Sequence, residues 1–111
     1  MSELVYLACP YSHPHPAIRE ERFNAVTKVA AELLSEGHLV FSPITHAHPM
    51  AEVGDLPRNW EFWEKFDRAY LQHSYKIIVL QLDGWKTSTG VAAEVAIAKE
   101  LGLIVEYRPC D

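Results

Sequence analysis

The sequence predicts an α/β fold, a three-layer sandwich with a parallel sheet of four or five strands. Two observations carry this prediction. Short apolar runs of strand length alternate along the chain with longer segments whose apolar residues recur every three or four positions. Strands separated by helices form right-handed βαβ units, which bring the strands side by side in one parallel sheet. With 111 residues, the chain is long enough for one domain, residues 1–111, with its own core.

The predicted elements alternate along most of the chain. Four apolar runs predict strands over residues 4–9, 38–42, 76–82 and 103–107. Three periodic segments predict helices over residues 17–37, 58–73 and 89–101. Gly37 and Gly102 stand where glycine commonly ends a helix. This order of elements favours a small flavodoxin-like sandwich.

Two segments are predicted to be irregular. Residues 10–16 carry three prolines, which exclude a helix interior and a central strand. Residues 43–57, with His46, His48 and Pro49, form a predicted long loop. A loop of this length in a small domain is usually functional or mobile.

Composition restricts the class of partner. The formal net charge is −5, which argues against a nucleic-acid polymer because phosphate backbones bind basic faces. A single nucleotide needs only a few local donors and stays open. No apolar run reaches about 18 residues, and the N-terminus is not a basic segment followed by an apolar one, so we expect no membrane span, no signal peptide and a cytoplasmic location. Cys9 and Cys110, at opposite ends of the chain, match neither a disulfide framework nor a zinc site.

The segment from Leu82 to Glu94 is the predicted ligand site. A strand ends here, a polar turn containing Gly84 follows, and a helix opens. In open α/β sheets, ligands bind where the carboxyl ends of strands meet helix N-termini. At about 100° per residue, Glu94 falls on the apolar, inward arc of the helix together with Val91 and Ala98.

Glu94 is therefore a carboxylate on a buried face, and glutamate is seldom buried without a partner. A capping box would explain it, but this motif needs Ser or Thr three residues earlier, where the sequence has Val91. A structural ion pair is the alternative, with no obvious partner in the sequence. We favour a functional carboxylate at the floor of a pocket, kept ionised by the helix N-terminus.

A second carboxylate repeats this pattern. Asp67 stands one turn after Trp63 and three residues before Tyr70, within the aromatic stripe of its predicted helix. Alone, it would be interpreted as a polar group satisfied at a helix–sheet boundary. Two acidic residues on helices that flank one strand instead match the paired carboxylates of glycosidic chemistry. In such a pair, one attacks or stabilises an oxocarbenium-like centre and the other handles protons.

Three motifs, in order along most of the chain, resemble the nucleoside 2-deoxyribosyltransferase superfamily. The opening Tyr6-Leu7-Ala8-Cys9-Pro10 resembles the Tyr-Leu-Ala-Gly-Pro of that family, with Cys9 in place of the glycine. Asp67, followed by the predicted strand 76–82, resembles the placement of its aspartate. The stretch Ser88-Thr89-Gly90-Val91-Ala92-Ala93-Glu94 resembles its Gly-x-x-x-Glu signature.

The resemblance implies an activity and three catalytic residues. Glu94 corresponds to the nucleophile that attacks the anomeric carbon of the sugar. Asp67 corresponds to a residue that positions the substrate or handles protons, and Tyr6 to a hydroxyl that orients the nucleophile. The implied reaction is cleavage of the N-glycosidic bond of a (deoxy)nucleoside or nucleoside 5'-monophosphate, by hydrolysis or transfer. It requires no cofactor.

Ser88 favours a phosphorylated substrate. The transferases have an acidic residue six positions before the glutamate, whereas a serine there is similar to the deoxynucleoside 5'-monophosphate N-hydrolases of the same superfamily. A hydroxyl at a helix N-terminus binds an anion that an aspartate would repel, and Arg19 and Arg22 add positive charge nearby. The residues expected to contact the substrate are Pro10, Ser12, Arg19, His46, Asp83, Ser88 and Gly90.

The histidines leave alternatives open. His13/His15 and His46/His48 are His-x-His pairs, and in an extended chain both rings of such a pair face one side, as a metal site needs. No Asp or Glu stands at a fitting ligand spacing, so we expect no metal.

The main alternative function is a nucleotide-binding module without catalysis, and the lesser one a metal-dependent hydrolase. We expect a small-molecule nucleoside or nucleotide as partner and, from the aromatic helix 58–73, a homo-oligomer.

Overall fold

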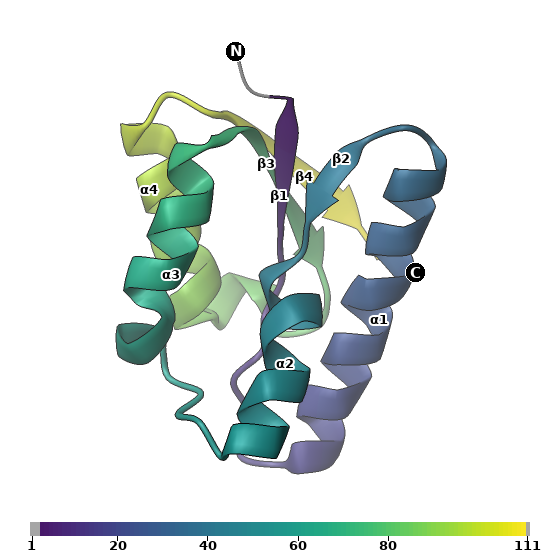
Figure 1. The fold of residues 1–111 in the computed structure, drawn as a ribbon, viewed down its shortest axis with the longest axis vertical. Helices are drawn as coiled ribbons and strands as arrows, with labels where there is room; N and C mark the ends of the chain where they lie inside the picture. Colours follow the sequence, from purple (N-terminus) through teal and green to yellow (C-terminus); the bar gives the residue numbers. More distant parts are fainter. Residues whose placement is uncertain (1–2, 111) are drawn as a thin grey trace.

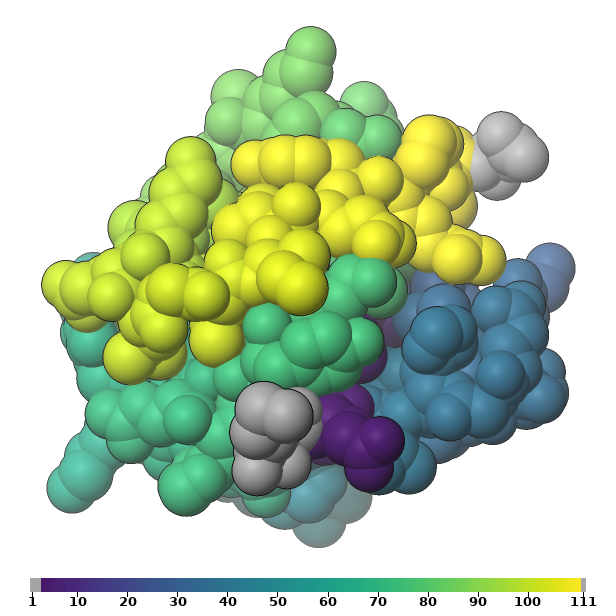
Figure 2. All heavy atoms as spheres, turned by 90° about the horizontal axis from the view of Figure 1, so that it is seen from above, coloured from purple at the N-terminus to yellow at the C-terminus, as the bar shows by residue number. Residues whose placement is uncertain are grey.

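Four parallel strands form one sheet in the order β2-β1-β3-β4 (Figure 1). The computed structural model describes residues 3–110, and the strands are β1 (Leu4–Ala8), β2 (Leu39–Phe41), β3 (Ser74–Gln81) and β4 (Ile104–Pro109). Seen from the amino ends of the strands (Figure 2), the first residues of β1, in purple, lie between the green segment with β3 and the blue segment with β2. The predicted flavodoxin-like fold is confirmed, with four strands among the described residues.

Helices cover both faces of this sheet. They are α1 (Pro16–Ser35), α2 (Pro43–Gly54), α3 (Trp60–Gln72) and α4 (Thr89–Glu100), with a short 3-10 helix, η1 (Trp85–Thr87), before α4. α1 lies against one face, and α3 and α4 lie together against the other (Figure 1). α2 packs along α1, with a distance of 2.8 Å between the hydroxyl oxygens of Thr27 and Thr45. Within residues 3–110, no helix is long and apolar enough to cross a membrane.

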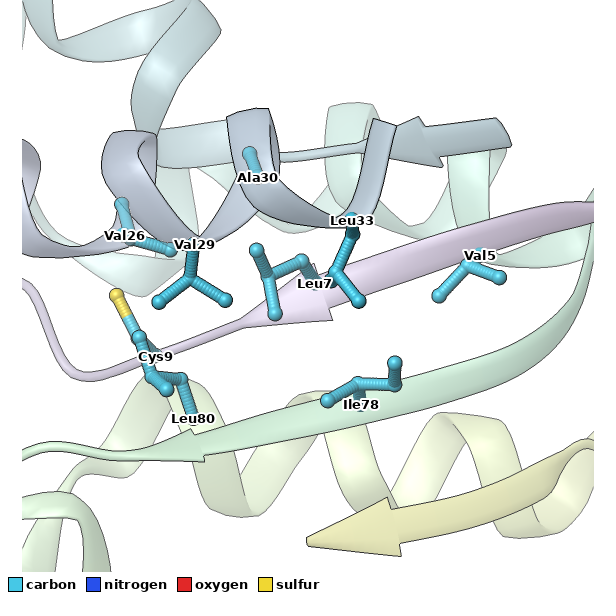
Figure 3. Close-up of a cluster of buried hydrophobic side chains, with 9 residues drawn as sticks. All are labelled: Val5, Leu7, Cys9, Val26, Val29, Ala30, Leu33, Ile78 and Leu80. Atoms are coloured by element: carbon cyan, nitrogen blue, oxygen red, sulfur yellow. The ribbon is translucent and has the colours of Figure 1, made fainter. Parts of the chain in front are cut away.

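Alternating side chains of the central strands build two cores. Val5 and Leu7 of β1 point toward α1 and pack with Val26 and Leu33 (Figure 3). Tyr6 belongs to the second core, on the side of α3 and α4, as the two-residue period of a strand requires. This alternation directs Tyr6 toward the two helices that carry the predicted catalytic carboxylates.

The strand order places a topological switch point between β1 and β3. β1 continues into α1 on one face, whereas β3 continues through η1 into α4 on the other face. In flavodoxin-like sheets, the crevice outside the carboxyl ends of such a strand pair is the usual ligand site. The loops that follow β1 and β3 therefore flank the predicted site.

The prediction of a loop over residues 43–57 is wrong, because most of this segment is α2. Ser42 is the N-cap and accepts a hydrogen bond from N of Thr45, and Pro43 stands in the first turn, where proline is favourable. Pro49 obscured these start signals, since an interior proline removes a hydrogen bond and clashes with the preceding turn. The other predicted elements are present, with ends displaced by one or two residues, as is usual for helix and strand termini.

Replacement of Pro49 by alanine tests whether this segment is helical. In a helix, the exposed Pro49→Ala change restores a backbone donor and should raise the free energy of unfolding by about 1–3 kcal/mol. In a loop, the same change would lower it by about 0.4–1 kcal/mol, because it increases the freedom of the unfolded chain. Urea unfolding measures the sign. Pro14→Ala, in the loop before α1, is the control that should show the small loss, and a loss in Pro49→Ala would contradict the helix.

Candidate active site

A cavity of about 510 Å³ opens at the carboxyl ends of β1 and β3. Its wall combines residues of both switch-point loops with residues of α2, α3 and α4, among them Cys9, His48, Asp67, Ser88 and Glu94. The volume lies within the range of about 300–1,000 Å³ that is usual for small-molecule sites. The cavity therefore stands where the fold is expected to bind a ligand.

Tyr6, Asp67 and Glu94 meet at one side of this cavity. The hydroxyl of Tyr6 donates a hydrogen bond to Oε2 of Glu94, and Asp67 is its second side-chain partner. All three residues are buried, with exposed fractions of 0%, 8% and 5%. They come from β1, α3 and α4, so the tertiary structure brings the whole predicted catalytic group together.

Burial places the two carboxyl groups under an electrostatic constraint. It raises the pKa of Asp67 from 3.8 to about 7, and together with the nearby Asp67 it raises the pKa of Glu94 from 4.5 to about 8. Two like charges in such a site cannot both form readily, so at neutral pH the pair holds a shared proton. Tyr6 remains a hydrogen-bond donor, because burial raises the pKa of its phenol well above the usual value.

The helix N-terminus does not keep Glu94 ionised, contrary to the prediction. Glu94 lies five residues after Thr89, the first residue of α4, and the helix dipole acts mainly within the first turn. The hydrogen bond from Tyr6 is the contact that favours the ionised form of Glu94 against the effect of burial. The predicted inward arc is confirmed for Glu94, since the buried residues of α4 are Val91, Glu94, Ile97 and Ala98.

The start of α4 supplies donors to the cavity, whose wall includes Thr87, Ser88, Thr89 and Gly90. Ser88 is the N-cap of α4, and its Oγ accepts a hydrogen bond from N of Val91 at 3.2 Å. This acceptor role leaves the hydroxyl proton of Ser88 available to a ligand. A helix N-terminus with a free hydroxyl proton suits an anion. The structure thus places Ser88 and Gly90, two of the expected substrate contacts, in the cavity wall.

Arg22 joins the two loops at the switch point. Its guanidinium donates to O of Ser12, after β1, and to O of Asp83, after β3, both at 3.1 Å. Arg22 and Ser12 also line the cavity. Gly84 has a φ of +92°, and a Cβ there would lie 2.8 Å from Nη2 of Arg22, so only glycine fits without displacement of the guanidinium. The sequence indicated Arg22 as a source of charge, and the structure adds this bridging contact.

Four predicted substrate contacts lie outside the cavity wall. Pro10 is fully buried and Asp83 is exposed, and neither side chain lines the cavity. Arg19 lines a separate, more open hollow beside it. His46 is on the exposed side of α2 and stacks on Phe66, with ring centroids 5.7 Å apart. The switch-point rule identified the edge of the sheet where the cavity lies, but it does not give the direction of individual side chains.

His48 lies at the centre of a polar network beside the cavity. Its Nδ1 is 2.5 Å from the hydroxyl of Tyr11, and its Nε2 is 2.8 Å from Glu20 and 3.7 Å from Glu52. One ligand atom each of Glu20, His48 and Glu52 lies within 4.8 Å of the others, a spacing that could hold a metal ion. The expectation that no carboxylate stands at ligand spacing is therefore wrong, because Glu20 and Glu52 both lie beside His48. However, Arg58 pairs with Glu52 at 2.6 Å, and His48 donates to Glu20. We interpret the cluster as a hydrogen-bonded network, because its carboxylates already have His48 and Arg58 as partners.

The expectation that His46 and His48 face one side is wrong. Both lie in α2, where residues two positions apart point about 200° apart, so His48 is buried and His46 is exposed. The rings of His13 and His15 do lie together, with centroids 5.3 Å apart. Within the part of the chain that the structure describes, no carboxylate completes a three-residue metal cluster with either of them.

Two tryptophans of α3 form an aromatic part of the cavity wall. Trp60 and Trp63 both line it, and Nε1 of Trp63 donates to O of Pro57 at 2.8 Å. Trp60 also packs against the core beneath α3. Aromatic rings in a cavity wall can stack on a planar ligand.

Replacement of Glu94 by glutamine tests the electrostatic constraint. Because burial raises the pKa of Asp67 and Glu94 to about 7 and about 8, the folded protein binds protons more tightly than the unfolded chain. The free energy of unfolding should therefore fall as the pH rises from about 4 to 8. Glu94→Gln removes one of these groups, so its Tm should fall less than that of the wild type between pH 5 and pH 8.5. The difference between the two falls should be several degrees, since about 1 kcal/mol shifts Tm by roughly 4–8 °C. Exposed Glu21→Gln is the control, and parallel Tm profiles of Glu94→Gln and wild type would contradict the constraint.

Comparison with known proteins identifies a family without an assigned activity. No curated protein sequence matches the chain. Residues 3–107 match the family described as Domain of unknown function (DUF1937). The matched region includes Tyr6, Asp67 and Glu94, and it covers nearly the whole chain. The protein therefore belongs to the DUF1937 family.

Proposed function

We propose that the protein cleaves the N-glycosidic bond of a (deoxy)nucleoside or nucleoside 5'-monophosphate, with Glu94 as the nucleophile. The observation that carries this proposal is the buried pair of carboxyl groups, Glu94 and Asp67, linked by Tyr6 beside one cavity. Paired carboxyl groups in different protonation states are the usual equipment for glycosidic bonds. Cys9 also lines the cavity, but burial raises the pKa of its thiol and keeps it protonated, which makes it a poor nucleophile.

The first step is attack by the ionised carboxylate of Glu94 on C1' of the sugar. A bond forms between a carboxylate oxygen and C1' while the C1'–N bond breaks, and its electron pair leaves with the base. Tyr6 holds the attacking group through its hydrogen bond. Water then releases the sugar from Glu94 in hydrolysis, or a second base takes it up in transfer.

Asp67 controls the charge of the site in this scheme. In the state that attacks, Asp67 holds the shared proton and Glu94 is ionised, a form of Glu94 that the hydrogen bond from Tyr6 favours. Because the pKa of Glu94, about 8, is higher than that of Asp67, about 7, this is the less populated of the two arrangements of the proton. When Glu94 becomes a neutral ester, no charged carboxylate beside Asp67 opposes its ionisation, and Asp67 releases its proton to water in the cavity. The ionised Asp67 is then a general base for the attacking water. The two steps use the same pair in opposite protonation states.

The donors around the start of α4 favour a 5'-monophosphate. The hydroxyl proton of Ser88 is available to a ligand, and Arg22 contributes positive charge to the same cavity. Hydrogen bonds from charged groups to phosphate are about twice as strong as those between neutral groups. A phosphate at this end would leave the sugar near Glu94 and the base toward the remaining wall.

A nucleotide-binding module without catalysis is the second candidate. It is favoured by the burial of Glu94, which raises the pKa of the carboxyl and weakens it as a nucleophile. Such a module would be stabilised thermally by nucleotides without releasing any base. A thermal-shift screen of nucleosides and nucleotides, followed by chromatography for free base, distinguishes the two functions.

Substitution of Glu94 tests the proposed nucleophile. Glu94→Gln retains the hydrogen bond from Tyr6 but cannot attack, so release of base from a nucleotide panel should fall by about 10⁴-fold or more. A 2-fluoro-2-deoxynucleotide should also leave a covalent adduct on the wild-type protein, which peptide mass spectrometry would locate on Glu94. Glu21→Gln, on the exposed surface of α1, is the matched control. Full activity of Glu94→Gln would exclude the assignment.

Replacement of Ser88 by aspartate tests the phosphate site. Aspartate caps a helix as well as serine does, so α4 should keep its stability, but its charge repels a phosphate. We expect the ratio of kcat/KM for the 5'-monophosphate to that for the unphosphorylated nucleoside to fall by about tenfold or more, the loss of one charge-assisted contact. Ser35→Asp, at the exposed end of α1, is the control for added charge. An unchanged ratio in Ser88→Asp would show that the phosphate does not bind there.

A further inference from the structure

The network of Glu20, His48 and Tyr11 reaches the same cavity as the carboxyl pair, and the scheme above gives it no role. Tyr11 and His48 both line the cavity. We propose that Tyr11 is a further catalytic residue, which donates a proton to the departing base, and that His48 and Glu20 are positioning residues that supply this proton. This inference rests on the proposed function.

The carboxyl pair and the His48 network approach the cavity from different layers of the fold. Glu94 and Asp67 come from α4 and α3, on one face of the sheet, whereas Glu20 belongs to α1 on the other face and His48 to α2, which packs along α1. In a displacement at C1', the base leaves on the side away from the nucleophile. A proton donor for the base is therefore needed away from Glu94, and the network provides a hydroxyl from the other layer.

Hydrogen-bond chemistry sets the direction of this network. The carboxylate of Glu20 only accepts, so Nε2 of His48 carries a proton toward it. Nδ1 of His48 faces the oxygen of Tyr11 at 2.5 Å. The proposed step uses the form of His48 that carries a proton on each ring nitrogen. Its Nδ1–H donates to the Tyr11 oxygen, and Tyr11 keeps its own O–H proton, which is free to be donated into the cavity.

Arg58 completes the site by stabilising the oxygen of Tyr11. Its guanidinium hydrogen-bonds to that oxygen and opposes the rise in pKa that burial imposes on the phenol. In the proposed step, the electron pair of the broken C1'–N bond goes to the base, which takes the proton of Tyr11. The Tyr11 oxygen then takes the Nδ1 proton of His48. His48 regains a proton from water beside Glu20, whose side chain is 54% exposed.

A purely structural role explains only part of this arrangement. His48 is 4% exposed and its bond to Glu20 would satisfy a buried imidazole nitrogen. That role does not require a hydroxyl on Tyr11, which could pack equally well as phenylalanine. The order carboxylate, imidazole, hydroxyl is the one in which an imidazole exchanges protons with a hydroxyl in catalytic sites.

Two substrates with different leaving groups test the role of Tyr11. One is a nucleoside 5'-monophosphate that the wild-type protein cleaves, and the other is 4-nitrophenyl 2-deoxyriboside 5'-phosphate, whose leaving group needs no proton. General acid catalysis contributes about 10²–10⁴-fold. Tyr11→Phe should therefore lose about 100-fold or more in kcat with the nucleotide and little with the nitrophenyl substrate. Tyr75→Phe, which removes a partly exposed hydroxyl on β3, should change neither rate.

Neighbouring glutamates of α1 test the positioning residues. Glu20→Gln should lower kcat with the nucleotide but not with the nitrophenyl substrate, by a smaller factor than Tyr11→Phe does. Glu21→Gln should lower neither kcat. The double variant Tyr11→Phe/Glu20→Gln should be no slower than Tyr11→Phe alone, because both act through one proton path.

The outcomes separate this inference from the proposed function. If Tyr11→Phe lowers kcat equally with both substrates, or with neither, the role of Tyr11 is overturned while Glu94-dependent base release stands. Failure of the wild-type protein to release base or nitrophenol from any substrate would overturn the proposed function, and this inference with it.

Discussion

Two carboxyl groups buried beside each other cannot both be charged at low cost, and the site depends on this constraint. α3 and α4 hold Asp67 and Glu94 close together, and β1 places the hydroxyl of Tyr6 between the two carboxyl groups. The arrangement costs stability, because burial favours their neutral forms. It also produces two groups of the same kind in different protonation states, which is the requirement for acid–base and nucleophilic chemistry in one cavity.

The rest of the fold positions this pair and closes the cavity around it. The alternation of β1 sends Tyr6 toward α3 and α4, and the switch point opens a crevice beside them. Arg22 connects the loops after β1 and β3 and lines the cavity between them. α2 contributes His48, the centre of the polar network that lies in the other layer. We propose that the carboxyl pair on one side and the His48 network on the other serve a reaction in which a base departs from a sugar.

Much of the fold could be predicted because its local signals agree with one another. The four strands are short apolar runs, and α1, α3 and α4 show clear helical periodicity, so these elements were identified within one or two residues. α2 was missed because Pro49 contradicts its other signals. Ser42 followed by Pro43 was the pattern that could have revealed it, and a predicted helix there would have placed Glu52 one turn from His48.

The sequence by itself determined the fold class and singled out Glu94 and Asp67, because a carboxylate on an apolar helix face is visible from periodicity alone. Tyr6 was indicated only by the resemblance of its motif to the nucleoside 2-deoxyribosyltransferase superfamily. Only the tertiary structure decided what each side chain meets. It joined Tyr6 to residues more than 60 positions away, placed His48 against Glu20, and turned His46 outward. The physical reason is that periodicity fixes which face of an element is buried, whereas hydrogen-bond partners and pKa shifts depend on which elements pack together in space.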